Sequence, residues 1–202
     1  MKIKRLSRPA RERQILDKAL AIFVEQGYQG TGMDHIANAV GVSRPVIYDH
    51  FSSKDAVYLA CLREARLCLD AALFDSHSDS APPHEQLLAA MRGYFLFAVN
   101  EPLSWRLLYE SGNAVAGPAS VEARHLRRQT VAKLADMIRA WRPHADDVEI
   151  MAFAHALSGA GEQLSKWQSE SEVDSDRVVS AFLRFAWTGL ESLLPRSPER
   201  RD

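Results

Sequence analysis

The stretch HIANAVGVSRPVIYDHFSSK, residues 35–54, decides the fold because two short segments with apolar faces flank a single glycine. The apolar residues of the first segment lie at helical spacing, and Val46 or Ile47 anchors the second. Gly41 provides a tight turn, since glycine accepts backbone angles that other residues avoid. Two helices joined at a steep angle by such a turn form a helix-turn-helix. The pattern alone also fits helical hairpins that bind no DNA.

Positive charge stands at the starts of two predicted helices in this region. Ser43 is a natural N-cap, Arg44 takes the first helical position, and Pro45 lies in the first turn, where its missing N–H costs nothing. A cation there opposes the helix dipole by about 0.3–1 kcal/mol, so an anionic partner is the better explanation. Tyr48, four residues after Arg44, projects from the same face. An arginine fork fits the guanine edge in the major groove, and Arg44 is therefore the predicted base contact.

The same reasoning applies at the start of the next helix. Ser52 and Asp55 resemble a capping box, and the free N–H groups together with Lys54 fit one phosphate. Thr31, at the start of the first short helix, is expected to add a hydroxyl to the phosphate backbone.

The segment GYQGTGMDHIANAVGVSRPVIYDHFSSKDAVYLA, residues 27–60, resembles the N-terminal domain of the TetR family of bacterial transcriptional regulators. The shared features are a glycine-aromatic turn, Ile-Ala in the first short helix, Gly-Val-Ser, a short helix ending in tyrosine and phenylalanine, and a Ser-Lys helix start. The match spans about residues 10–60. Gly32 departs from the family, which more often has threonine or serine there. This departure leaves more of the expected contact with the DNA phosphate backbone to Thr31.

The resemblance implies that the second short helix enters the major groove. It also implies contact residues, in two groups: Ser43, Arg44, Pro45 and Tyr48 at the usual contact positions, and Thr31, His50 and Lys54 on phosphate. Structural alternatives stay open for three of them. Tyr48 can pack its ring against the first helix, His50 can cap the short helix, and Ser43 can act as a cap only.

Charge is unevenly distributed along the 202 residues. Residues 1–54 carry nine Lys and Arg against five Asp and Glu, whereas the whole chain has a net charge of −1. A basic head on an acidic body suggests that only the head meets a polyanion, although a mildly basic solvated helix explains the charge equally well. No apolar run is long enough for a transmembrane helix, and the two cysteines, Cys61 and Cys68, share one helical face. We therefore expect a reduced, cytoplasmic protein.

Helical spacing of apolar residues runs throughout the chain, and no strand pattern is present. The sequence predicts an all-α fold of about nine helices: an N-terminal three-helix helix-turn-helix domain and a C-terminal helical domain for ligand binding and dimerisation. The expected ranges are residues 1–53 for the first, 54–195 for the second and 196–202 for a flexible tail. Proline and glycine place the helix ends. The expected helices cover 8–26, 33–40, 43–50, 54–75, 83–99, 102–110, 118–141, 146–168 and 174–194.

The C-terminal part is expected to bind a small molecule and to pair subunits, as the family plan implies. The last two helices carry broad apolar faces with small residues, which favours a two-fold dimer through them. The expected dimer contacts are Phe153, Leu157, Ala160, Leu164, Phe182, Ala186, Leu190 and Leu193. The expected pocket residues, each of which also suits an ordinary core, are Met91, Tyr94, Phe95, Trp105, Leu108, Tyr109, His155 and Glu162.

The sequence thus predicts a homodimeric repressor that a small-molecule effector releases from its DNA operator. In the expected mechanism the helix from Lys54 acts as a lever between effector and DNA. No nucleophile elbow, phosphate loop or HExxH motif is present, and the acids around His144 are expected at a helix start, so neither an enzyme, a cofactor nor a metal is predicted. Two alternatives remain: a regulator controlled by a protein partner, and a helical scaffold or enzyme whose basic head binds an acidic protein.

Overall fold

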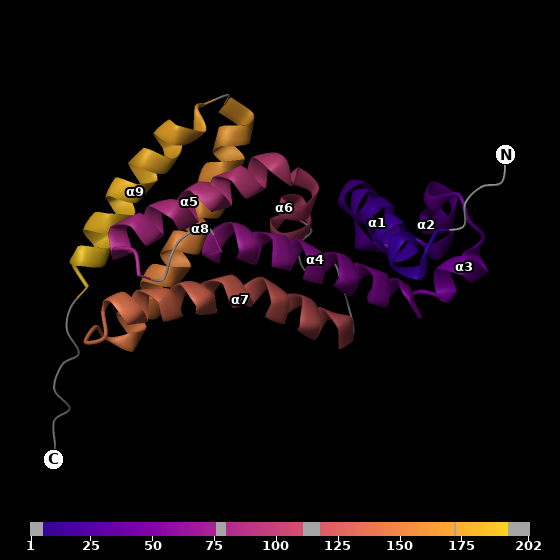
Figure 1. The fold of residues 1–202 in the computed structure, drawn as a ribbon, viewed down its shortest axis with the longest axis horizontal. Coiled ribbons are helices and arrows are strands. Elements are labelled where there is room, and N and C mark those ends of the chain that lie inside the picture. The colour runs from indigo at the N-terminus through magenta and orange to yellow at the C-terminus, as the bar shows by residue number, and fades with distance from the viewer. Residues whose placement is uncertain (1–5, 76–79, 111–117, 172, 194–202) are drawn as a thin grey trace, which may run out of the picture. The chain divides into compact units, whose positions relative to one another are not determined.

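The computed structural model describes residues 6–75, 80–110, 118–171 and 173–193, which form nine α-helices and no strand (Figure 1). The predicted all-α fold is confirmed. No helix within these ranges is both long and apolar enough to cross a membrane. The chain divides into two compact units, one of residues 1–67 with 101–127 and the other of residues 68–100 with 128–202. These units differ from the predicted ranges because residues 101–127 pack with the N-terminal part.

The first unit contains the predicted helix-turn-helix. Its helices are α1 (Arg8–Gly30), α2 (Met33–Val40), α3 (Arg44–Tyr48), the first part of α4 (Lys54–Phe74), α6 (Pro102–Tyr109) and the start of α7 (Pro118–Trp141). In this unit α1 packs on α2 and α6, and α2 packs on α3. The central side chains of the core are fully or almost fully buried: Ile15, Phe23, Ile36, Ile47, Tyr58 and Leu62.

Two glycines in this unit adopt positive φ, one within a helix and one at a helix end. Gly27 (φ 71°, ψ 169°) breaks α1 one turn before its end, and Gly41 (φ 75°, ψ 36°) ends α2 in the left-handed conformation. The N–H of Gly41 donates to the carbonyls of Ala37 and Asn38, which satisfies two groups that the helix end would leave without partners. These two turns set the directions of α2 and α3 and so place the residues that follow.

The second unit is built round α5. Its helices are the rest of α4, α5 (Pro83–Asn100), the rest of α7, α8 (Asp147–Ser171) and α9 (Ser175–Glu191). Helix α5 packs on α8 and α9, which also pack on each other. Gly93 lets α5 approach α4 closely, since a methyl group there would lie 1.7 Å from the carbonyl oxygen of Ala72. Lys133 of α7 donates to the carboxylate of Asp70 at 2.6 Å and joins α7 to α4.

The helix boundaries agree with the prediction to within a few residues, and two caps differ from the prediction in detail. Asp146 accepts the backbone N–H groups of Val148 and Glu149, so this acid caps the start of α8, in the stretch where acids were expected for the dipole alone. At the start of α4 the predicted capping box is wrong. Ser53, not Ser52, accepts the N–H of Ala56 at 3.1 Å.

Candidate nucleic-acid interface

The candidate interface is the exposed face of α3, which is held in place by apolar contacts on its other side. Ile47 is fully buried, and it anchors α3 against α2. Ser43 is the N-cap, yet its side chain makes no capping hydrogen bond, and Pro45 lies in the first turn. Ser43, Arg44 and Pro45 are all exposed. The structure therefore presents three of the predicted contact residues on one continuous surface at the start of the helix.

Arg44 is held by two neighbours on this surface. Its Nη1 lies 3.2 Å from Oδ2 of Asp34 in α2, and its Nη2 donates to the Tyr48 hydroxyl at 3.2 Å. The hydrogen bond to Tyr48, together with the charge of Asp34, raises the pKa of Arg44 above its ordinary value, so the guanidinium stays cationic. The guanidinium carbon also lies 5.5 Å from the centre of the Tyr48 ring.

The Tyr48 side chain lies at the surface. It is 43% exposed, which disagrees with the alternative that its ring packs against the first helix. Arg44 and Tyr48 thus form one exposed polar pair on a single helix face, as their spacing of four residues predicts.

Lys54 and Thr31 contribute to the structure of the first unit itself. The Lys54 ammonium donates to the Tyr28 carbonyl at 2.9 Å and lies 4.1 Å from the centre of the Tyr28 ring. The Tyr28 hydroxyl in turn contacts the carboxylate of Asp55. Thr31 is only 2% exposed, and its hydroxyl donates to the Gly27 carbonyl at 2.8 Å. Its hydroxyl is therefore not presented to a phosphate.

His50 packs against α1. Its Nδ1 lies 3.2 Å from Oε1 of Glu12, and only 10% of its side chain is exposed. Arg8 joins the same cluster, since it pairs with Glu12 at 3.1 Å and donates to the Asp49 carbonyl at 3.0 Å. These contacts fasten the end of α3 to α1. Asp34, Arg8 and Glu12 were not predicted, because the groups that they contact around α3, namely Arg44, the Asp49 carbonyl and His50, lie ten or more residues away along the chain.

The predicted pocket residues fall into two groups, one in each compact unit. In the second unit, Met91, Tyr94 and Phe95 are buried on α5, and Tyr94 packs against Gly161 of α8. Burial raises the pKa of Glu162, which is half-buried, whereas His155 is exposed. In the first unit, Trp105 and Tyr109 lie with ring centres 5.4 Å apart on α6, and Leu108 is buried beside them.

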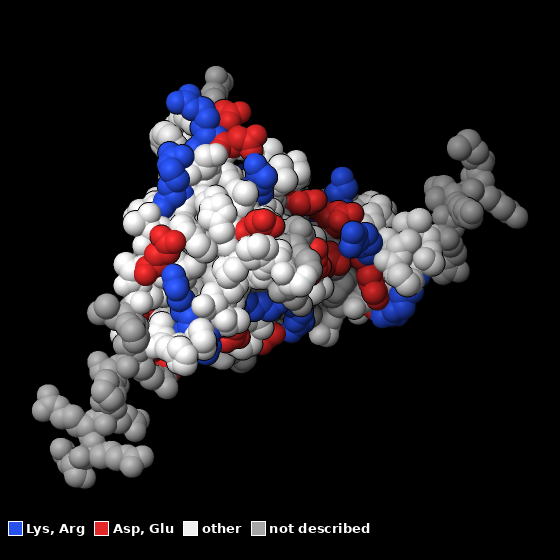
Figure 2. Space-filling model, turned by 60° about the vertical axis from the view of Figure 1, so that its left-hand side comes forward, with Lys and Arg blue, Asp and Glu red and all other residues white. Residues whose placement is uncertain are grey.

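The predicted dimer residues also divide into two groups. Leu157, Phe182, Ala186 and Leu190 are buried within the chain itself, while Phe153, Ala160, Leu164 and Leu193 are half-buried. Other apolar residues of α8 and α9 are exposed instead: Val148, Met151, Trp167 and Phe185. Trp167 and Phe185 line an open groove of about 430 Å³ between these helices, together with Ala160, Leu164 and Ala181. Figure 2, which turns the side carrying α9 forward, shows uncharged surface interrupted by separate acidic and basic side chains.

Family models match both parts of the chain. The model described as bacterial regulatory proteins of the tetR family matches residues 15–61, and the model described as a tetracyclin repressor-like C-terminal domain matches residues 83–189. The second match alone covers more than half of the chain. The protein belongs to the TetR family. It is a DNA-binding transcriptional regulator with a helix-turn-helix, and not an enzyme.

The similar proteins include one that is matched along most of the chain and one that is matched in its N-terminal part. The HTH-type transcriptional activator FasR of Mycolicibacterium smegmatis is 28% identical over 187 residues, which is 92% of this chain and 85% of the relative. An HTH-type transcriptional repressor of Mycobacterium tuberculosis is 46% identical over 55 residues, 27% of this chain and 29% of that one. The match to the first extends the likeness into the C-terminal part.

Solved structures share the fold. A TetR-like transcriptional regulator from Rhodococcus sp. RHA1 has a TM-score of 0.77 and 28% identity, and the match covers 93% of this chain and 100% of that one. AibR in complex with isovaleryl coenzyme A and operator DNA has a TM-score of 0.70 and 20% identity, covering 87% and 97%. At 20% identity the second likeness shows the fold alone.

Proposed function

We propose that the protein is a homodimeric repressor in the cytoplasm that a small-molecule effector releases from its operator. The proposal that the protein reads DNA sequence rests on the exposed, cationic Arg44 at the start of α3, with Tyr48 beside it. The remainder of the proposal concerns how two copies pair and how a ligand changes their grip on DNA.

Arg44 is the proposed base-reading residue. Its guanidinium carries five N–H donors in a planar fork, and a guanine edge accepts two of them in the major groove. Ser43 and Pro45 flank it on the exposed start of α3, where a hydroxyl and an apolar ring can meet neighbouring bases. The negative charge of Asp34 offsets part of the unfavourable interaction between the Arg44 charge and the dipole of α3. DNA is therefore not the only compensation for that charge, although it remains the proposed partner.

A second copy of the chain is the proposed occupant of the exposed apolar surface of α8 and α9. Trp167 and Phe185 are large side chains of the kind enriched at interface cores. In a two-fold dimer the same patch meets itself, so one surface serves both copies. Such a dimer presents two copies of α3 to DNA half-sites about 34–36 Å apart, or a multiple of that distance. The predicted contacts Ala160 and Leu164 line this groove and stay part of the proposal.

The proposed route from effector to DNA is α4, a single helix that contributes residues to both compact units. Its 21 residues span about 31 Å at the usual rise of ~1.5 Å per residue. Lys54 and Asp55 tie its start to Tyr28, and in the second unit Asp70 pairs with Lys133. An effector that binds better to one tilt of this helix changes operator affinity by that difference. Isovaleryl coenzyme A, which AibR binds, is the first probe.

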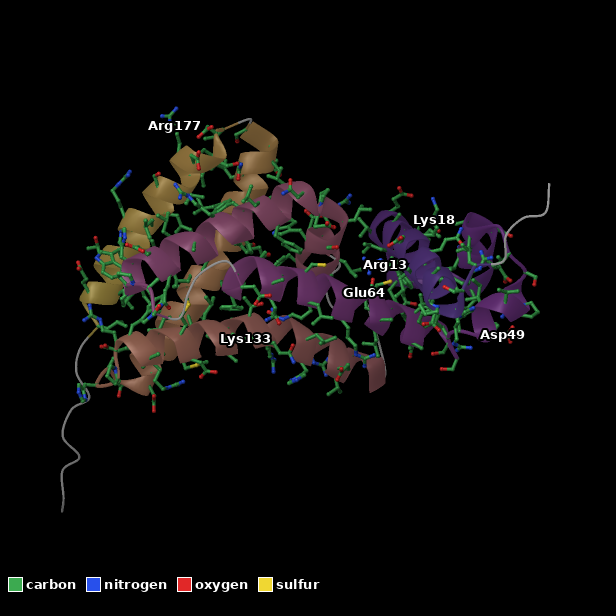
Figure 3. All side chains as sticks on the ribbon, in the orientation of Figure 1. Arg13, Lys18, Asp49, Glu64, Lys133 and Arg177 are labelled. Carbon is green, nitrogen blue, oxygen red and sulfur yellow. The ribbon has the colours of Figure 1, made fainter. Side chains whose placement is uncertain are left out.

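Selection of bound fragments from host DNA supplies the operator for the test. Fluorescence anisotropy then compares that operator with a scrambled duplex for three variants. Arg44→Ala is expected to reduce the preference for the operator by about tenfold or more, because a base contact is lost. Lys54→Ala is expected to weaken binding to both duplexes alike. It is also expected to reduce the slope of log affinity against log salt concentration by about one, as the loss of a phosphate contact does. Lys18→Ala, which removes an exposed cation of α1, is the control for charge (Figure 3).

Equal losses on operator and scrambled DNA from both Arg44→Ala and Lys54→Ala would contradict these roles. Transcription in vitro from a template carrying the operator decides the direction of regulation: the proposal expects less transcript, and FasR-like activation would overturn the repressor assignment. Unchanged operator affinity with the effector at saturation, judged by a direct binding signal, would exclude release by that ligand. Absence of binding to any duplex at low salt would overturn the whole proposal.

A further inference from the structure

We propose that Asp34 is a specificity-determining residue that positions Arg44 for its base without itself contacting DNA. The inference rests on the proposed role of Arg44 in DNA reading. Asp34 lies on α2 and Arg44 on α3, so the pair spans the helix-turn-helix, with Nη1 and Oδ2 3.2 Å apart. Tyr48 takes the other terminal nitrogen of the same guanidinium at 3.2 Å.

Asp34 and Tyr48 form a clamp on the Arg44 guanidinium, and this clamp leaves Arg44 able to bind a base. Asp34 accepts one N–H from Nη1 and Tyr48 accepts one from Nη2. Arginine has five N–H donors, so three remain, and a bidentate contact to guanine uses two. The two neighbours therefore fix the direction of the fork while its remaining donors stay available. A clamp that engaged all of the donors would instead hide the arginine from DNA.

The pair is placed for positioning more than for stability. The Arg44 and Asp34 side chains are 53% and 64% exposed, and exposed ion pairs contribute little to folding. Helices α2 and α3 already pack on each other, and Ile36 of α2 and Ile47 of α3 are fully buried. A long exposed side chain loses rotamer freedom when it binds, and a side chain held beforehand loses less. Asp34 thus lowers the entropy lost when Arg44 meets its base.

The carboxylate of Asp34 also has an electrostatic cost. It is exposed on the surface proposed to meet DNA, so it is expected to repel the phosphates of every DNA sequence alike. Its removal is therefore expected to act in two opposite directions: tighter binding to DNA in general and weaker preference for the operator. A residue with a merely structural role would weaken both kinds of binding together.

The variant Asp34→Asn removes this charge and keeps the shape of the side chain. Its matched control is Asp49→Asn, which removes an exposed carboxylate at the end of α3 whose side chain is not part of the clamp (Figure 3). Arg44→Ala and the double variant Asp34→Asn with Arg44→Ala complete a cycle. Each protein is used at full length, and thermal unfolding verifies that it is folded.

Each protein selects duplexes from a random-sequence pool, and anisotropy at one salt concentration measures affinity for the wild-type motif and for a scrambled duplex. Asp34→Asn is expected to lower the ratio of the two affinities by about threefold to tenfold, with the loss confined to the base positions that Arg44→Ala also affects. Asp34→Asn and Asp49→Asn are both expected to tighten binding to scrambled DNA, by about twofold, whereas Asp49→Asn keeps the ratio. Asp34→Asn is expected to lower the ratio no further in the Arg44→Ala background.

The outcomes distinguish failure of the proposed role of Asp34 from failure of the proposed DNA-binding function. If the wild-type chain selects a motif and Asp34→Asn selects the same motif with the same base preferences, the role of Asp34 is overturned while the proposed function stands. The same holds if Asp34→Asn and Asp49→Asn change the ratio equally, or if Asp34→Asn lowers it independently of Arg44. If the wild-type chain selects no motif, the proposed function fails and takes this inference with it.

Discussion

Glu162 is the residue whose titration the structure makes testable. Burial on α8 raises the pKa of Glu162 above its ordinary value, and the nearby Lys166 offsets this in part. A raised pKa in the folded state means that the protonated form is favoured by folding. Its contribution to stability is complete below the unfolded value, near pH 4.5, and is lost as the pH rises through the folded value.

Glu162→Gln is therefore expected to unfold at a higher temperature than the wild type at pH 7.5 and at nearly the same temperature at pH 4. Thermal unfolding followed by circular dichroism across this pH range measures the difference. Glu170→Gln, at an exposed position near the end of the same helix, is expected to show no such trend. A Glu162→Gln difference that is constant with pH would contradict the effect of burial.

The two cysteines differ in their surroundings although they share α4. Cys61 is buried, and burial raises the pKa of its thiol, whereas Cys68 is exposed. A thiol-specific chromogenic disulfide is expected to react rapidly with the exposed Cys68 thiol in the native protein. It is expected to react with the Cys61 thiol only after denaturation, because burial disfavours the reactive thiolate. Cys68→Ser is expected to abolish the rapid reaction, and Cys61→Ala to leave it unchanged.

Side-chain partners were the part of the site that the sequence predicted least. The exposed pair Arg44 and Tyr48 follows from their spacing on one helix, but His50 meets Glu12 from 38 residues away, and Lys54 meets the Tyr28 carbonyl from 26. Contacts of this kind depend on how α1 packs against the elements that follow it. A cation at a helix start was therefore recognised from the sequence, while its partners within the chain were not.

At the scale of helices, glycine and proline made the boundaries predictable. Positive φ at Gly27 and Gly41, and prolines in the first turns of α3, α5, α6 and α7, fall where the sequence placed the helix ends. The cap of α4 was misplaced by one residue because two serines are adjacent, and only geometry selects Ser53. The predicted pocket was divided for a different reason. Helix α6 follows α5 directly in the chain, yet it packs on α1 in the first unit.

Close approach between helices gives a graded prediction for three glycines. A methyl group on Gly93 would lie 1.7 Å from a backbone oxygen of α4, on Gly189 2.8 Å from the Phe153 ring, and on Gly161 3.3 Å from the Tyr94 ring. A ring can move more easily than a helix backbone. Gly93→Ala is therefore expected to lower the free energy of unfolding by about 3 kcal/mol or more.

Gly189→Ala and Gly161→Ala are expected to change it by about 1 kcal/mol or less, because the helix propensity of alanine offsets part of the strain. Chemical denaturation measured for all three variants tests this order. Equal losses at Gly93 and Gly161 would contradict the close approach of α5 and α4.

At the scale of the whole molecule, the proposed dimer makes Phe185 a critical side chain. Phe185 is 65% exposed in the chain, and Phe185→Arg places a charge at the centre of the proposed interface. The variant is expected to weaken the dimer by about 2 kcal/mol or more, as for other central aromatic residues. Analytical ultracentrifugation measures the association, and Leu96→Arg on α5, at 57% exposure, is the control. A dimer dissociation constant that Phe185→Arg changes no more than Leu96→Arg does would exclude this surface as the interface.

The sequence named Phe182, Ala186 and Leu190 among the expected dimer contacts, and so chose a face of α9 that the structure buries within the chain. Both helices have apolar residues over more than one face, and periodicity cannot say which face the chain's own α5 covers. The structure assigns Phe182, Ala186 and Leu190 to the interior and leaves Phe185 outside.

The chain passes between its two compact units three times, after Leu67, Asn100 and Arg127. Neither unit is therefore a continuous stretch that can be cut out at one place in the gene. A fusion that transplants residues 1–53 alone would leave α6 behind and uncover the surface of α1 on which it packs. A chimeric regulator built from this protein needs to carry residues 101–127 along with the N-terminal helices if its DNA-reading half is to keep its native support.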